Sequence, residues 1–108
     1  MDGGYVYLIC DPCNDSFKIG VTRDLGSNRL KKLQTGNSTE LHICASYKCD
    51  YPFRLEKMLH SKFSNYRLLN EWFELPCEVV VKFIEICDEL NKIIKLMLDN
   101  PFFRKNIK

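Results

Sequence analysis

Hydrophobic and polar residues alternate in two runs near the start of the chain. The first run is YVYLIC at residues 5–10, and the second is FKIGVT at residues 17–22. A period of two residues is typical of a strand with one buried face. The segment DPCND between the runs is rich in residues that favour turns. The pattern therefore predicts a β-hairpin.

The predicted hairpin has two different faces, because successive residues of a strand point to opposite sides. The apolar face should join the core and carries Val6, Leu8, Phe17, Ile19 and Val21. The second face is more polar and carries Tyr5, Tyr7, Lys18, Gly20 and Thr22. A glycine in a strand lets another group approach the backbone closely. We therefore expect the functional surface of the hairpin on its second face.

Helical periodicity follows the hairpin. The next segment predicts a helix that begins at Asp24 or Ser27 as N-cap and ends at Gly36. Residues 41–47, LHICASY, then have the β-branched and aromatic content of a third strand.

A second helix is predicted after Asp50, which can cap it, with Pro52 in its first turn. Glu56 and His60 lie four residues apart and so share one flank of this helix. We expect His60 to be a packed residue, or one that supports a metal-binding side chain, rather than a metal ligand itself. A short apolar element, NEWFELP, follows and ends at Pro76. The buried stripe of the helix is expected to be Leu55, Met58, Leu59 and Phe63.

A long final helix is predicted over residues 77–98, followed by a basic tail. Its apolar residues are spaced alternately three and four apart, which is typical of a helix that packs along a narrow seam. Two interpretations are open: the seam is buried within one subunit, or it forms a homodimer interface. The seam consists of Val80, Phe83, Cys87, Leu90, Ile94 and Met97.

The positive charge is concentrated in one part of the sequence. The chain has 108 residues and a formal net charge of only +2, so any electrostatic contact with nucleic acid must be local. Residues 17–34 hold five Lys or Arg side chains and a single acid. We therefore expect nucleic acid to bind here, through Thr22, Arg23, Lys31 and Lys32 in addition to the catalytic candidates named below.

The sequence shows neither a signal peptide nor an apolar window long enough to span a membrane, so an intracellular location, cytoplasmic or nuclear, is expected. Six cysteines in such a chain are expected to be reduced thiols. Cys10 and Cys13 form a CxxC pair, and Cys44 and Cys49 could complete a zinc site. The loose spacing of the second pair favours buried or idle thiols instead.

The order of these motifs resembles the GIY-YIG nuclease superfamily. The resemblance rests on YVYLI, FKIGVT and Arg29, which lies nine residues after Gly20. More closely, the run GYVYLI, FKIGVT, RLKKLQTGN, LEKMLHSKF and NEWFEL is similar to a phage and viral branch described as DNA-binding. It covers residues 4–75. The resemblance implies an α+β fold with a small three-stranded antiparallel sheet flanked by helices, forming a domain over residues 1–76. Residues 77–108 would pack on it or form the dimer interface.

The resemblance also implies a set of catalytic residues. Tyr7 would help activate the attacking water, Lys18 takes the place of a second tyrosine, Arg29 would hold the scissile phosphate, and Glu56 would bind one divalent metal ion. Tyr5 replaces the first glycine of the motif and the family's supporting histidine is absent, so binding is better supported than cleavage.

The same residues supply a coherent chemistry of their own. Hydrolysis of a phosphodiester needs a group that orients or deprotonates water, a cation over the phosphate and a hard metal held by carboxylate oxygen. Tyr7, Arg29 and Glu56 supply one of each, and Lys18 would stabilise the phenolate or contact phosphate. A single carboxylate with waters suits Mg²⁺ or Mn²⁺ better than zinc. We therefore expect a metal-dependent DNA endonuclease or, alternatively, a weak or inactive nucleic-acid-binding module on the same surface. A protein-interaction domain is a third, less favoured interpretation.

Overall fold

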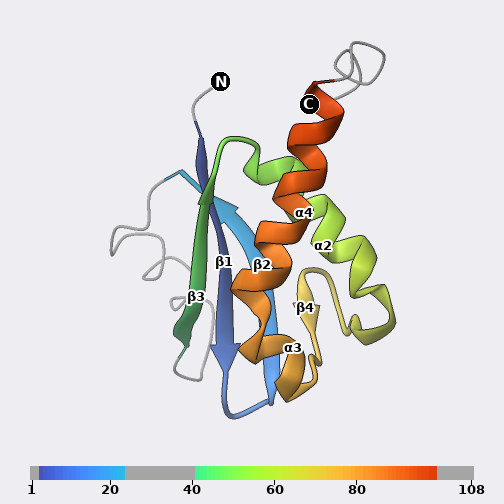
Figure 1. Cartoon of the computed structure of the whole chain (residues 1–108). Helices are drawn as coiled ribbons and strands as arrows, with labels where there is room; N and C mark the ends of the chain where they lie inside the picture. Colours follow the sequence, from blue (N-terminus) through green and yellow to red (C-terminus); the bar gives the residue numbers. More distant parts are fainter. Residues whose placement is uncertain (1–2, 24–40, 100–108) are drawn as a thin grey trace.

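The computed structural model describes residues 3–23 and 41–99, and the described part is an α+β fold, as predicted. Four strands form one antiparallel sheet in the order β3-β1-β2-β4 (Figure 1). The three expected strands are present, and the fourth comes from the NEWFEL segment, which pairs with β2 through Phe73 and Trp72. The strands are β1 (Gly4–Asp11), β2 (Ser16–Thr22), β3 (His42–Cys49) and β4 (Trp72–Phe73).

The hairpin of β1 and β2 forms in the register that the alternation predicts. Val6 pairs with Val21, and Leu8 pairs with Ile19, so these apolar side chains lie on one face. In the connecting turn Asn14 donates a hydrogen bond of 2.8 Å to the carboxylate of Asp11.

The helices lie on the apolar face of the sheet (Figure 1). The helix α2 (Pro52–Lys62) begins with Pro52 as expected, but its N-cap residue is Tyr51 rather than Asp50. The expected single helix over residues 77–98 is instead two helices. At Lys82 the backbone takes φ −97° and ψ 10°, and the first helix ends there. The remaining helices are the one-turn η1 (Ser64–Tyr66), α3 (Cys77–Val81) and α4 (Phe83–Leu98).

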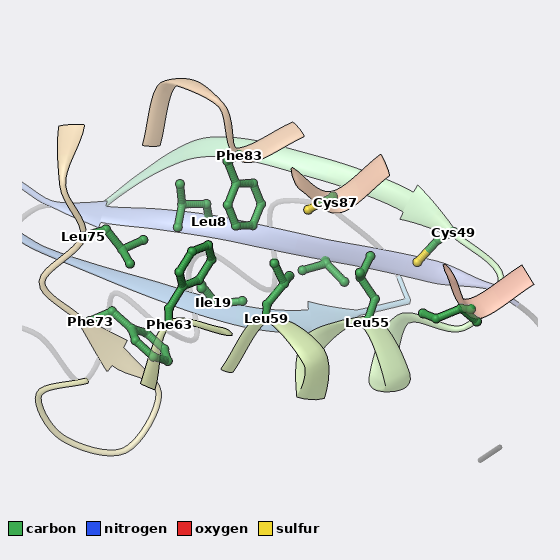
Figure 2. Packing of buried hydrophobic residues seen from close by; sticks show 12 residues of the cluster. Leu8, Ile19, Cys49, Leu55, Leu59, Phe63, Phe73, Leu75, Phe83 and Cys87 are labelled. Carbon is green, nitrogen blue, oxygen red and sulfur yellow. The ribbon is translucent and has the colours of Figure 1, made fainter. Parts of the chain in front are cut away.

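The main core lies between the sheet and the two longer helices. Leu55 and Leu59 from α2 and Phe83 and Cys87 from α4 point toward the strands (Figure 2). Each of these side chains is at most 1% exposed. The apolar face predicted for the hairpin contributes to this cluster, with Val6, Leu8 and Ile19 fully buried and Phe17 and Val21 packed beside them.

A second, smaller cluster covers the other face of the sheet. Tyr7, Ile9 and Leu41 are buried there, and Trp72 packs against them. The expectation of an open, polar second face is therefore wrong around Tyr7. Alternation fixes which residues share a face, but residues distant in the sequence decide whether solvent reaches it.

The seam predicted for the final helix packs within its own subunit. Phe83, Cys87 and Ile94 are buried in the main core, and the other seam residues pack partly buried against it. Tyr47 of β3 donates a hydrogen bond of 3.0 Å to the carboxylate of Asp88, which further fixes α4 to the sheet. The apolar side chains that α4 leaves exposed are Ile84, Ile93 and Leu96.

Two further expectations concern the helix predicted after the hairpin and the absence of a membrane span. The helix expected to begin at Asp24 or Ser27 lies outside the described residues, and so do Arg29, Lys31 and Lys32. Within residues 3–23 and 41–99, no helix is both long enough and apolar enough to cross a membrane.

Candidate functional site

A cluster of charged side chains forms where β2, β4 and α2 meet. Lys18 projects from β2, Glu56 from α2, and Glu71 lies directly before β4. The Lys18 Nζ atom is 3.4 Å from Oε2 of Glu71, and the Lys18 side chain is only 15% exposed. The backbone amide of Ile19 also donates a hydrogen bond of 3.3 Å to the carbonyl oxygen of Glu71. We call Lys18, Glu56 and Glu71 the carboxyl cluster.

The environment of Glu56 favours its protonated form. Burial is the main cause of its raised pKa, and the charge of Glu71 and a hydrogen bond with it raise the pKa further. His60 and Lys18 act in the opposite direction but do not cancel these effects. The raised pKa means that the folded protein binds the Glu56 proton more tightly than the unfolded chain does.

His60 has a structural contact on the same flank of α2. Its Nε2 atom is 3.0 Å from the carbonyl oxygen of Ile19 and must donate to it, since a carbonyl only accepts. The ring also meets Phe73 edge-on, with 5.0 Å between ring centroids. His60 is therefore packed, as expected from the sequence, and it fixes α2 against β2 beside Glu56.

Tyr7 is placed differently from the expectation. Its side chain is 1% exposed, and it lies opposite Gly20 in the β1–β2 pairing. A Cβ atom added to Gly20 would collide with the Tyr7 ring. The close approach that Gly20 permits is thus used by Tyr7 itself and not by a ligand. Lys18 lies on the same face two residue pairs along the ladder, opposite Ile9.

The predicted nucleic-acid contacts are only partly described. Thr22 is partly exposed at the end of β2, and the next residue, Arg23, is exposed. Thr22 is four residues from Lys18, about 13 Å along the strand. Arg29, Lys31 and Lys32 lie outside the described residues.

The cysteines do not converge on one point. Cys44 and Cys49 are five residues apart in β3, about 17 Å along an extended strand. Burial and the neighbouring Cys10 raise the pKa of the Cys44 thiol to about 11. A four-thiolate zinc site built from both cysteine pairs does not fit this geometry. Among the described residues, no three His, Cys, Asp or Glu side chains are grouped to hold a metal ion.

Glu71 is the site residue that the sequence interpretation missed. It stands in the NEWFEL segment, whose pattern predicts only a short apolar element. A carboxylate directly before the strand-forming Trp72 was the sequence signal that could have identified Glu71. Its ion pair with Lys18, however, depends on the position of β4 against β2.

The chain matches a known family over most of its length. The family model of the T5orf172 domain matches residues 4–88, which extends from β1 into α4. The chain belongs to the T5orf172 domain family. This finding corrects the assignment to the GIY-YIG nuclease superfamily, because the family that matches is a different one. T5orf172 domains are nuclease-like or DNA-binding domains of viral and phage proteins.

A similar curated protein comes from a virus. The "Uncharacterized protein 460R" of Invertebrate iridescent virus 6 is 30% identical over 106 residues. The similarity covers 93% of this chain and 46% of the viral protein, so the chain spans about half the length of that relative. No solved structure matches the chain.

Proposed function

We propose that this T5orf172 domain binds DNA and hydrolyses its phosphodiester backbone at the carboxyl cluster with the help of one divalent cation. The observation that carries the proposal is the pair of carboxyl groups, Glu56 and Glu71, held together beside the Lys18 ammonium. Groups with perturbed protonation that lie next to a specific charged partner are enriched at functional sites. The nuclease-like character of the family supports the same conclusion.

The chemistry of the carboxyl cluster fits a hard cation. Glu56 and Glu71 offer carboxylate oxygens, which Mg²⁺ and Mn²⁺ prefer. Mg²⁺ commonly takes one or two carboxylates, completes its shell with waters and substrate phosphate, and needs no third protein ligand. Such an ion supplies Lewis-acid stabilisation of the phosphate and a more acidic bound water.

The protein's own groups have separable roles in this proposal. Glu56 would offer its carboxylate to the cation, because positive charge that enters the cluster favours the ionised form of Glu56. Lys18 neutralises part of the remaining negative charge and so lets a phosphate approach. We assign contacts with the phosphate backbone to the basic segment that holds Arg29, Lys31 and Lys32, because its positive charge complements phosphate.

The proposal is tested by incubating the purified chain with supercoiled, branched and single-stranded DNA in Mg²⁺, Mn²⁺ or chelator. The wild type should cut at least one of these forms, and only with metal. Glu56→Gln should lower the rate at least about 100-fold while DNA affinity is not lowered, because the change removes no positive charge. Glu89→Gln on the exposed side of α4 is the matched control and should cut normally. Equal rates for the two variants would refute the assignment of Glu56.

A second candidate function is DNA binding without cleavage. It is favoured by the burial of Tyr7, because a phenol that is 1% exposed is poorly placed to activate water. Absence of cleavage by the wild type on all three DNA forms with either metal would establish this second function instead.

A further inference from the structure

A basic groove runs along the flank of α2 that faces α4. It has a volume of about 440 Å³ and is lined by Arg54, Lys57, Met58, Ser61 and Lys62 from α2 and by Leu90 from α4. We call it the α2 groove. Three of its six lining residues are cations, one offers a hydroxyl group, and none is acidic. An anion is therefore the kind of ligand that complements this groove.

Arg54 carries an unused hydrogen-bond donor inside the protein. Its Nε atom is buried and has no hydrogen-bond partner within the described structure. A buried donor without a partner costs free energy, and such groups in folded proteins usually mark an absent water, ion or ligand. An arginine that can offer several N–H donors in one plane suits phosphate in particular.

The α2 groove is separate from the carboxyl cluster. Residues seven apart complete about two turns of an α-helix, so Arg54 and Ser61 share one flank of α2. Glu56 is two residues after Arg54 and is rotated about 200° around the helix axis, which places it on the opposite flank. The two sites therefore lie on either side of one helix.

We propose that the α2 groove binds phosphates of a nucleic-acid backbone, as a second contact beyond the carboxyl cluster. This inference rests on the proposed DNA binding and extends it. A helix with its side chains is about 10–12 Å wide, and duplex DNA carries about one negative charge per 1.7 Å of its axis. A duplex that crosses α2 therefore presents roughly six charges over this width, enough to contact both flanks.

The contact has a measurable signature in salt. The affinity for duplex DNA falls as salt rises, and each phosphate contact increases the magnitude of the slope of log affinity against log salt concentration by about 0.9. Loss of three contacts should therefore lower the slope by about 2.7. Between about 50 and 200 mM salt the wild type should lose roughly 40-fold more affinity than a variant without the groove cations.

The experiment measures binding of the full chain to labelled duplex DNA by fluorescence anisotropy, in chelator so that no cleavage occurs. The groove variant combines Arg54→Gln, Lys57→Gln and Lys62→Gln. The control variant combines Lys48→Gln, Lys82→Gln and Lys95→Gln, which removes the same charge from exposed positions outside the groove. Should the groove variant fail to fold, Lys57→Gln and Lys62→Gln, both exposed, replace it and should lower the slope by about 1.8.

The slope should fall in the groove variant and change by less than one contact in the control. Equal losses in both variants would overturn the proposal, because they would reflect net charge alone. Inorganic pyrophosphate at constant ionic strength distinguishes a free-phosphate site. One result would overturn the assignment to the nucleic-acid backbone. In it, pyrophosphate raises the melting temperature of the wild type but not of the groove variant, while the groove and control variants bind DNA with equal affinity. Absence of DNA binding by the wild type would also overturn it. Failure of the cleavage proposal is a separate result, seen as no cutting by the wild type or normal cutting by Glu56→Gln, while the groove variant still binds DNA more weakly than the control.

Discussion

The packing of Tyr7 on Gly20 predicts that an alanine at position 20 destabilises the protein. A Cβ atom at this position would lie 2.5 Å from Cζ of Tyr7 and 3.0 Å from Cε1. Non-bonded carbon atoms prefer about 3.5–4.0 Å, so the ring must move by about 1 Å. The ring is buried against Ile9, Leu41 and Trp72, and a densely packed interior has little room for such a shift.

The sign of the effect is what makes Gly20→Ala informative. Without the clash, replacing a glycine inside a strand by alanine would stabilise the protein by about 0.5–1 kcal/mol. Overpacking of a buried site costs about 1–3 kcal/mol. We expect the clash to dominate, so that Gly20→Ala lowers the free energy of unfolding by about 1–2 kcal/mol. For a domain of this size, each kcal/mol lowers the melting temperature by about 4–8 °C.

Urea denaturation followed by tryptophan fluorescence measures the change in the free energy of unfolding with a probe next to Tyr7. Trp72 is the single tryptophan of the sequence and packs in the same cluster as Tyr7. A double-mutant cycle with Tyr7→Ala, or with Tyr7→Val if the alanine variant does not fold, isolates the contact. In either background Gly20→Ala should be neutral or stabilising, which gives a coupling energy of about 1–3 kcal/mol. A stabilising Gly20→Ala in the wild-type background, or the same cost in both backgrounds, would refute the reasoning.

Three further predictions follow from the described residues. A raised pKa means that the folded state binds the Glu56 proton more tightly, so this stabilisation is complete below the reference pKa of 4.5 and is lost as the pH rises through the folded-state value. Urea midpoints measured across pH should therefore show Glu56→Gln more stable than the wild type at neutral pH. A higher midpoint of the variant at acidic pH only would contradict this. Iodoacetamide should modify the exposed Cys13 faster than Cys44, because the pKa of the Cys44 thiol is raised to about 11 and little of it is ionised. Equal rates of modification by mass spectrometry would contradict the raised pKa of Cys44. A homodimer through α4 would have to use its exposed apolar residues, since the predicted seam is buried. Light scattering should then give twice the 12.7 kDa mass, halved by Ile93→Lys with Leu96→Lys, whereas a wild-type mass of 12.7 kDa would exclude the dimer.

The strands and their register could be predicted from the sequence because they depend on local alternation. The pairing of Leu8 with Ile19 follows from the pattern and a short turn. The burial of Tyr7 could not be predicted in the same way. It depends on Leu41 and Trp72, which come from distant segments and close over the second face of the sheet. The break at Lys82 was also missed, since the apolar pattern continues through it without a proline or glycine.

The carboxyl cluster was predicted in part. The resemblance names Lys18 and Glu56 as catalytic candidates, and the structure brings both beside Glu71, while their catalytic roles stay predictions. Glu71 was missed because its contact with Lys18 requires β4 to pair with β2, a pairing that two residues carry. The family assignment failed for a related reason. Motifs such as YVYLI and FKIGVT mainly describe a half-buried hairpin, and hairpins of this kind are not specific to one family.

The carboxyl cluster has a stability cost that distinguishes cutting from binding. Burial and the neighbouring Glu71 raise the pKa of Glu56, which destabilises the folded protein at neutral pH. A domain that only binds DNA gains nothing from this arrangement, because negative charge repels phosphate. A glutamine at position 56 would keep the hydrogen bond to Glu71 and avoid both costs. Functional sites commonly retain groups that are unfavourable for stability. Glu56→Gln should therefore increase stability, not lower DNA affinity, and abolish cleavage. A variant that gains the first two properties and still cuts DNA would separate Glu56 from catalysis.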